Sequence, residues 1–147
     1  MKKYLWLPLL LMTVIGSAAL TTKAQSTYGV RANVPFEFNV GDKTLPAGKI
    51  TVRGMSATNS GALAVSNADK AQHAIRIAHA LTTAPQNERG KLVFHKYGNR
   101  LYLAQVWIPG YDALEFNKSK IERALERETM LSKNSAPDLV TILADLQ

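Results

Sequence analysis

Three histidines are the side chains of this chain best suited to acid–base or metal chemistry. His73 and His79 lie six residues apart in an alternating stretch, and His95 follows later. Along an extended strand, His73 and His79 would be roughly 20 Å apart, too far to share a metal ion. His95 could approach either through strand pairing, but no carboxylate close in sequence completes a set of three or four ligands. We therefore expect no metal site.

Nucleophilic and carboxylate catalysis find little support in the residue pattern. The chain has no cysteine, and Ser56, Ser60 and Ser66 lack the Gly-x-Ser-x-Gly spacing of a nucleophile elbow. Glu37 projects from the polar face of an expected strand, and the sequence identifies no partner acid for it. We expect no catalytic residue, no cofactor and no enzyme; a hydrolase that uses His95 with a distant carboxylate is an alternative.

The segment Gly41-Asp42-Lys43-Thr44 looks like part of a phosphate-binding loop but predicts a turn. A phosphate loop needs a helix after it, because the free amides of the helix N-terminus bind the anion. Here Pro46 and Gly48 follow, and the Gly-x-x-x-x-Gly-Lys spacing is missing. We predict two bends, at 41–42 and 46–48, in one hairpin connection.

Alternation of apolar and polar residues predicts strands over much of the chain. From Val30 to Val40, six apolar residues share one parity, and Pro35 between them marks an edge, a bulge or a bend. After the hairpin connection, Ile50 and Val52 would point inward, and Thr51 and Arg53 outward. Further strands are expected at 63–66 and 72–81, and a loop at 82–90.

Gly98-Asn99 predicts a two-residue hairpin loop between two longer strands. The register pairs four sets of residues: Tyr97 with Arg100, His95 with Tyr102, Phe94 with Leu103, and Val93 with Ala104. One face of this hairpin, expected in the core, carries Leu92, Phe94, Leu101, Leu103 and Trp107. The other face carries His95, Tyr97, Tyr102 and Val106.

Two roles are open for the face that carries His95, Tyr97 and Tyr102. Exposed tyrosines on a sheet bind sugars or peptides by stacking and hydrogen bonding, which makes these three residues a candidate surface binding site. Alternatively, a helix covers them and forms a second core layer. We favour coverage, because an amphipathic helix needs an apolar surface to pack against.

The C-terminal part of the chain changes to a helical period. A helix is predicted at about Lys120–Ser132, after a Ser119–Glu122 capping box, with Ile121, Ala124, Leu125 and Glu128 at helical spacing. In the tail, 134–147, four residues at i, i+3, i+4 and i+7 predict a second short helix: Leu139, Ile142, Leu143 and Leu146.

Residues 1–24 have the form of a secretory signal peptide. Lys2 and Lys3 precede an uncharged apolar stretch, and small residues lead to a small-x-small site before Gln25. An uncleaved membrane anchor is the alternative, because the stretch is just long enough to cross a bilayer. Cleavage would remove three of the 18 basic residues and none of the 11 acidic ones, lowering the net charge from +7 to +4.

The remaining basic residues are scattered along the sequence, which is not typical of nucleic-acid binding. Weak attraction to anionic lipid or polysaccharide stays open. We therefore expect an exported protein, periplasmic or extracellular, with no membrane span after cleavage and no nucleic-acid partner. An envelope polymer or a protein is the expected kind of partner.

Two segments, VPFEFNVGDKTLPAGKITVR and LVFHKYGNRLYLAQVWIPG, resemble a group of small exported proteins abundant in acidobacterial genomes. Members of that group share a V-P-F-x-F-x-V-G-x-x-x-L-P-A-G segment, an L-V-F-H-x-Y-G-x-R segment and a basic-acidic helix, here Lys118 to Glu128. The resemblance covers about Val30 to Glu128. It implies no activity and no site residues.

These patterns predict a mainly β protein, a small antiparallel barrel or sandwich of about six or seven strands with a C-terminal amphipathic helix. After the signal peptide (1–24), residues 25–29 would form a flexible leader, 30–133 one domain and 134–147 a short amphipathic tail. The expected function is that of a secreted, non-enzymatic binding or structural module. A carrier that holds a small apolar ligand inside the barrel is the main alternative.

Overall fold

The computed structural model describes residues 28–55, 61–68, 71–81, 89–133 and 135–147. The predicted signal peptide lies outside the described residues, as do residues 25–27 of the predicted leader and 82–88 of the predicted loop. Gly29, expected in the leader, already belongs to the first strand. No helix in the described ranges is long and apolar enough to cross a bilayer.

The described chain forms ten strands and one helix. Their bounds are β1 Gly29–Val34, β2 Phe38–Val40, β3 Lys43–Leu45, β4 Gly48–Gly54, β5 Ala62–Asn67, β6 His73–Ala80, β7 Gly90–Tyr97, β8 Arg100–Trp107, β9 Leu114–Phe116, α2 Lys120–Lys133 and β10 Asp138–Leu146. The prediction of a mainly β chain with a helix near the C-terminus is confirmed.

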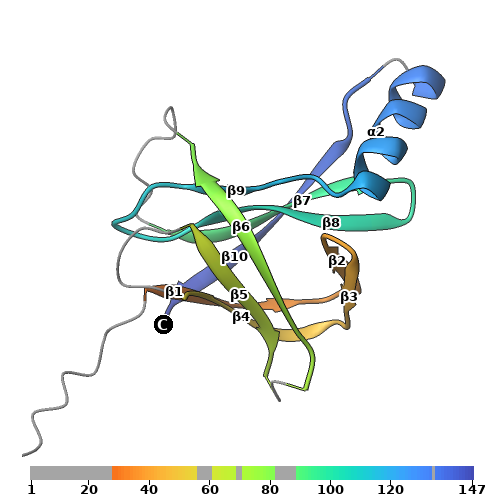
Figure 1. The fold of residues 1–147 in the computed structure, drawn as a ribbon. Helices are drawn as coiled ribbons and strands as arrows, with labels where there is room; N and C mark the ends of the chain where they lie inside the picture. The colour runs from red at the N-terminus through yellow and green to blue at the C-terminus, as the bar shows by residue number, and fades with distance from the viewer. Residues whose placement is uncertain (1–27, 56–60, 69–70, 82–88, 134) are drawn as a thin grey trace, which may run out of the picture.

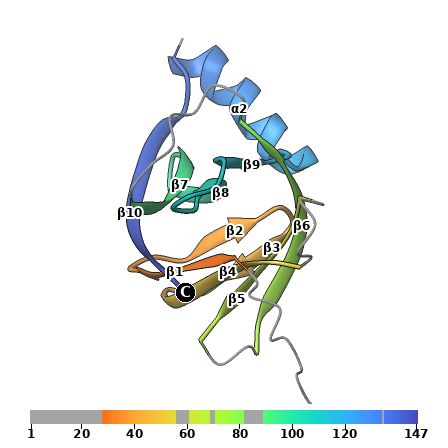
Figure 2. The same cartoon turned by 90° about the vertical axis from the view of Figure 1, so that its left-hand side faces the viewer.

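Eight of the strands close an antiparallel barrel in the order β7-β10-β1-β4-β5-β6-β9-β8, with β8 pairing back to β7. Figures 1 and 2 show this barrel from two directions, with α2 beside the β7–β8 hairpin at one end. Of the two architectures expected, the structure is the barrel. The expected number of six or seven strands was too low, because the ring alone has eight strands and two more short strands, β2 and β3, lie outside it.

Pro35 divides the first alternating segment into two strands with different partners. Val30, Val34 and Phe38 are all fully buried, as the alternation predicts. The chain bends at 35–37, so that β1 pairs with β4 in the barrel, whereas β2 lies parallel to β8 and pairs Asn39 with Tyr102. Of the three roles considered for Pro35, the structure shows the bend.

Gly41-Asp42 forms a tight turn between β2 and β3, not a phosphate loop. Gly41 has φ +64°, a left-handed conformation that favours glycine. β3 follows the turn, and after Pro46 the chain enters β4, which runs back along β1. The predicted hairpin connection is therefore confirmed, with the β2–β3 ribbon inserted into it.

The β7–β8 hairpin has the predicted register near its turn and departs from it further along. Tyr97 pairs with Arg100, His95 with Tyr102 and Phe94 with Leu103. Val93 then pairs with Gln105 instead of Ala104, because a β-bulge inserts one extra residue. The bulge reverses which side chains point inward beyond it, so Val106 is in the core. Trp107, expected there, instead has Lys91 Nζ over its ring, 3.9 Å from the ring centroid.

The barrel interior is packed with large apolar side chains from almost every strand. Phe94 is fully buried, with edge-to-face contacts to Phe36 and Phe38 at ring-centroid separations of 5.3 and 5.2 Å. β6 instead contributes small residues, because Ala74 and Ala78 face inward while Ile75 and Ile77 are exposed. Small and large side chains that alternate in this way fill a barrel of eight strands.

The predicted second helix is wrong, because residues 138–146 form strand β10. β10 pairs with β7 from Asp138 to Ala144 and with β1 through Asp145 and Leu146. Its inward side chains are Val140, Ile142 and Ala144, which pack on the core. The segment expected to be a separate tail is thus the strand that joins the two edges of the sheet.

Substituting threonine on the two sides of β10 tests this arrangement. We expect Val140→Thr to lower the free energy of unfolding by about 1 kcal/mol, because it places a hydroxyl against the core. Leu143 is 66% exposed and points outward. Leu143→Thr should therefore change the free energy of unfolding by less than about 0.5 kcal/mol. Urea unfolding measures both values. A larger loss of unfolding free energy for Leu143→Thr than for Val140→Thr would contradict the strand, because a helix would bury Leu143 and expose Val140.

Candidate functional site

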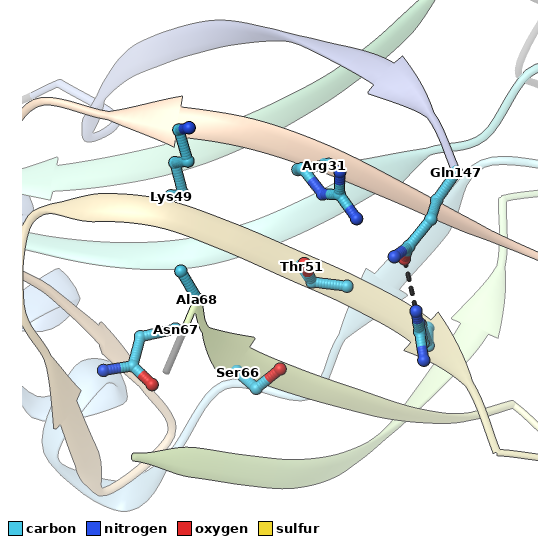
Figure 3. Close-up of a pocket in the computed structure, with 8 residues that line it drawn as sticks. Arg31, Lys49, Thr51, Ser66, Asn67, Ala68 and Gln147 are labelled. Carbon is cyan, nitrogen blue, oxygen red and sulfur yellow. Dashed lines mark hydrogen bonds between the residues drawn. The ribbon is translucent and has the colours of Figure 1, made fainter. Parts of the chain in front are cut away.

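A basic cleft lies on the outer face of the barrel where β1, β4 and β5 run side by side. Its lining residues are Arg31, Lys49, Thr51, Arg53, Ser66, Asn67, Ala68 and Gln147, and its volume is about 470 Å³. The pairing places Arg31, Thr51 and Ser66 in one row across the three strands. Figure 3 shows this row, with Lys49 to one side of Thr51. Arg53 follows on the other side of Thr51 along β4.

The strand period explains why these side chains share a face. Positions 49, 51 and 53 of β4 point outward because Ile50 and Val52, between them, are fully buried. Arg31 points outward on β1 for the same reason, between Val30 and Ala32. The outward direction of Thr51 and Arg53 was predicted, but their grouping with Arg31 and Ser66 was not, because it depends on which strands are neighbours.

The cations of the basic cleft have no carboxylate in contact within the described part of the chain. The two ion pairs found there are His95–Glu122 and Lys118–Glu126, far from the cleft. Arg53 instead donates from Nε to the Gln147 amide oxygen at 2.8 Å. The cleft therefore presents positive charge together with uncharged hydrogen-bonding groups.

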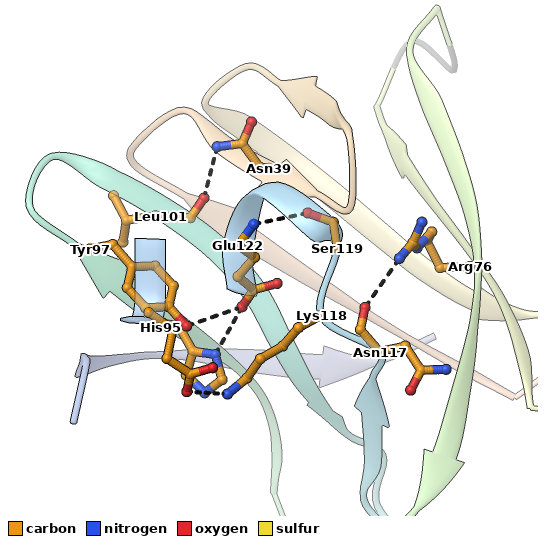
Figure 4. Close-up of polar contacts among 10 residues, drawn as sticks. Asn39, Arg76, His95, Tyr97, Leu101, Asn117, Lys118, Ser119 and Glu122 are labelled. Atoms are coloured by element: carbon orange, nitrogen blue, oxygen red, sulfur yellow. Dashed lines mark hydrogen bonds and ion pairs between the residues drawn. The ribbon is translucent and has the colours of Figure 1, made fainter. Parts of the chain in front are cut away.

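The predicted site residues lie elsewhere, in a buried polar layer between the β7–β8 hairpin and α2. We define this helix-covered layer as His95, Tyr97, Tyr102, Ser119 and Glu122. Figure 4 shows His95, Tyr97, Ser119 and Glu122 of this layer. His95 is 9% exposed, and Tyr97 and Tyr102 are each 4% exposed. The favoured prediction, coverage by the helix, is confirmed, and an exposed binding face formed by these three residues is contradicted.

Glu122 holds the helix-covered layer together. Its Oε1 lies 3.1 Å from His95 Nδ1 and accepts a long hydrogen bond, 3.5 Å, from the Tyr97 hydroxyl. Burial and then the nearby charges of Glu122 and Glu126 raise the pKa of Tyr97 well above its usual range. The phenol therefore stays protonated and donates to the carboxylate.

The start of α2 sets the position of Glu122. Ser119 Oγ accepts from the Glu122 amide at 3.2 Å, as in the predicted capping box. The second half of that box is replaced, since the Glu122 carboxylate bonds to His95 rather than turning back to the Ser119 amide. The helix also faces another way than expected: Glu122 is buried, whereas Ile121 is 51% exposed.

The two remaining histidines lie on β6 with exposed side chains. His79 Nε2 lies 2.6 Å from Asn117 Oδ1, and Glu115 is its partner across the β6–β9 pairing. The His73 carbonyl accepts from Lys43 Nζ at 3.2 Å. Across the described ranges, no group of three or more His, Cys, Asp or Glu side chains is arranged to hold a metal ion.

Comparison of the chain with protein-family models, with curated proteins and with solved structures gave no significant match.

A double-mutant cycle tests whether the His95–Glu122 contact stabilises the packing of α2 on the barrel. We expect His95→Leu and Glu122→Gln to show a coupling free energy of about 1–3 kcal/mol in denaturant unfolding, because the two groups are buried in contact. The matched control is Lys118→Gln with Glu126→Gln, a more exposed pair, whose coupling should stay below about 1 kcal/mol. A coupling free energy near zero between His95 and Glu122 would contradict this stabilising role.

Proposed function

We propose that this protein is an exported, non-enzymatic binding module that acts through the outer surface of its barrel. The observation that carries the proposal is the filled interior, which leaves the outside as the surface available to a partner. Export is supported by the signal-peptide pattern of residues 1–24 and by the resemblance to exported proteins. The absence of cysteine is compatible with export, because a domain of this size folds by packing alone.

The filled interior argues against the carrier alternative. An eight-stranded barrel is just wide enough either to be filled by side chains or to hold one small ligand. Ten inward residues have zero exposure, so no space large enough for a water molecule adjoins them: Val30, Val34, Phe38, Ile50, Val52, Leu63, Val65, Leu92, Phe94 and Val106. They come from five of the eight barrel strands and from β2, which favours the packed alternative.

The hollows lined by described residues open at the surface. They lie on the β1–β4–β5 face, beside β3, beside β9 and on α2. The first of these, the basic cleft, combines three cations with hydroxyl and amide groups. A rigid barrel that presents such a group of side chains suits recognition of a polar partner.

A hydrolase remains the second candidate because of one specific observation. Glu122 supplies the carboxylate within hydrogen-bond reach of His95 that such an enzyme needs to orient its base. The pair is enclosed by α2, however, and His95 lines none of the hollows named above. The same contacts are what a helix needs in order to stay attached to the barrel, so we favour the structural role.

Native mass spectrometry of the chain secreted by a bacterial host tests the proposal. We expect one species that begins at Gln25, with no added mass from a bound apolar molecule. Titration with fatty acid, followed by the fluorescence of Trp107, should then give no saturable change, because the described inward side chains pack against one another. A stoichiometric passenger, or saturable uptake of fatty acid, would support the carrier instead. A species that still carries residues 1–24 would contradict cleavage of the signal peptide.

A further inference from the structure

We propose that the basic cleft is a binding site for an acidic glycan, that is, a sugar chain that carries carboxylate, sulfate or phosphate groups. This inference rests on the proposed function and names the partner of the module. It is carried by four features of the cleft: its cations, its hydroxyl row, its amides and its open shape.

The cations are placed to bind one anionic group from several sides. Arg31 comes from β1, while Lys49 and Arg53 come from β4 two positions either side of Thr51. Arginine binds oxyanions through a planar pair of donors, and lysine adds a compact charge. Arg53 is held by its Nε bond to Gln147, and its terminal nitrogens make no hydrogen bond to the described residues.

The uncharged groups of the cleft match the rest of a sugar. Thr51 lies between Lys49 and Arg53 on β4, and Ser66 is its cross-strand partner on β5. Asn67 and Gln147 add side-chain amides at opposite ends of the lining, as Figure 3 shows. Hydroxyls and amides both donate and accept hydrogen bonds, which sugar hydroxyl groups also do. A partner that carries only charge would leave these four side chains unused.

Other anionic partners fit the cleft less well. None of the described residues that line it is aromatic, and single-stranded nucleic acids depend on such side chains to stack their bases. Among these described lining residues Ala68 alone is apolar, so they offer no apolar anchor for a lipid surface. Asp145 lies opposite Arg31 on β10 and lowers the local positive charge without lining the cleft.

Binding to defined glycans tests the inference. The probes are an oligogalacturonate for the carboxylate, dextran sulfate for the sulfate, a phosphorylated dextran for the phosphate, and neutral dextran of matched length. We expect at least one acidic probe to bind in isothermal titration calorimetry at low salt, more weakly as salt rises, and neutral dextran not to bind. The triple variant Arg31→Gln, Lys49→Gln, Arg53→Gln should lose about tenfold or more in affinity.

Matched variants distinguish a site from general positive charge. The control removes two arginines and one lysine from exposed positions elsewhere, with Lys96→Gln, Arg100→Gln and Arg127→Gln. It should keep affinity within about threefold. Asp145→Asn should strengthen binding about twofold, because it removes the one acid beside Arg31. Circular dichroism and urea unfolding confirm that each variant is folded.

Three results would overturn the inference. They are no binding of any acidic glycan, equal losses in the two triple variants, and binding of neutral dextran as tight as that of the acidic probes. Each of them would leave the exported, filled barrel as a binding module with another partner. Failure of the proposed function itself would be seen separately, as uptake of fatty acid.

Discussion

The structure depends on the closure of one sheet, and the chain end completes that closure. β10 pairs with β7 on one side and with β1 on the other. The backbone N–H of Gln147 then donates to the Gly29 carbonyl at 3.0 Å. Without β10, β1 and β7 would each present a row of unpaired backbone groups to solvent. Closure also brings Gln147 to Arg53, so the contact that completes the barrel also positions one end of the basic cleft.

The helix-covered layer illustrates a different balance of forces. A carboxylate buried against an imidazole costs desolvation free energy, and the pair does not by itself make a fold more stable than an apolar contact would. Its directional bonds do fix where α2 lies, since the Glu122 carboxylate has partners only at His95 and Tyr97 among the described residues. The rings of Tyr97 and Tyr102 pack edge to face with their centroids 5.9 Å apart and provide an apolar surface beside this contact. The helix is therefore attached by a specific polar contact rather than by a broad apolar stripe.

Local pattern was enough to predict most of the strands, but not their closure or their neighbours. The two-residue period from Val30 to Val40 and the turn at Gly98 depend on adjacent residues, and both predictions were confirmed. The bulge beside Ala104 has no local signal, so Val106 and Trp107 were assigned to the wrong faces. In 138–146 the apolar residues fit a helical period and a strand period alike, and pairing with β7 and β1 decides between them. The basic cleft was missed for the same reason, because Arg31 and Ser66 meet only when β4 lies between β1 and β5.

The C-terminal segment is a full member of the barrel, and hydrogen exchange of its backbone amides checks this. Amides of β10 that bond to β7 should exchange as slowly as those of β7 and β4, since all of them open only when the barrel unfolds. Exchange of the β10 amides at the rate of an unstructured peptide, while β4 and β7 stay protected, would contradict the closed barrel.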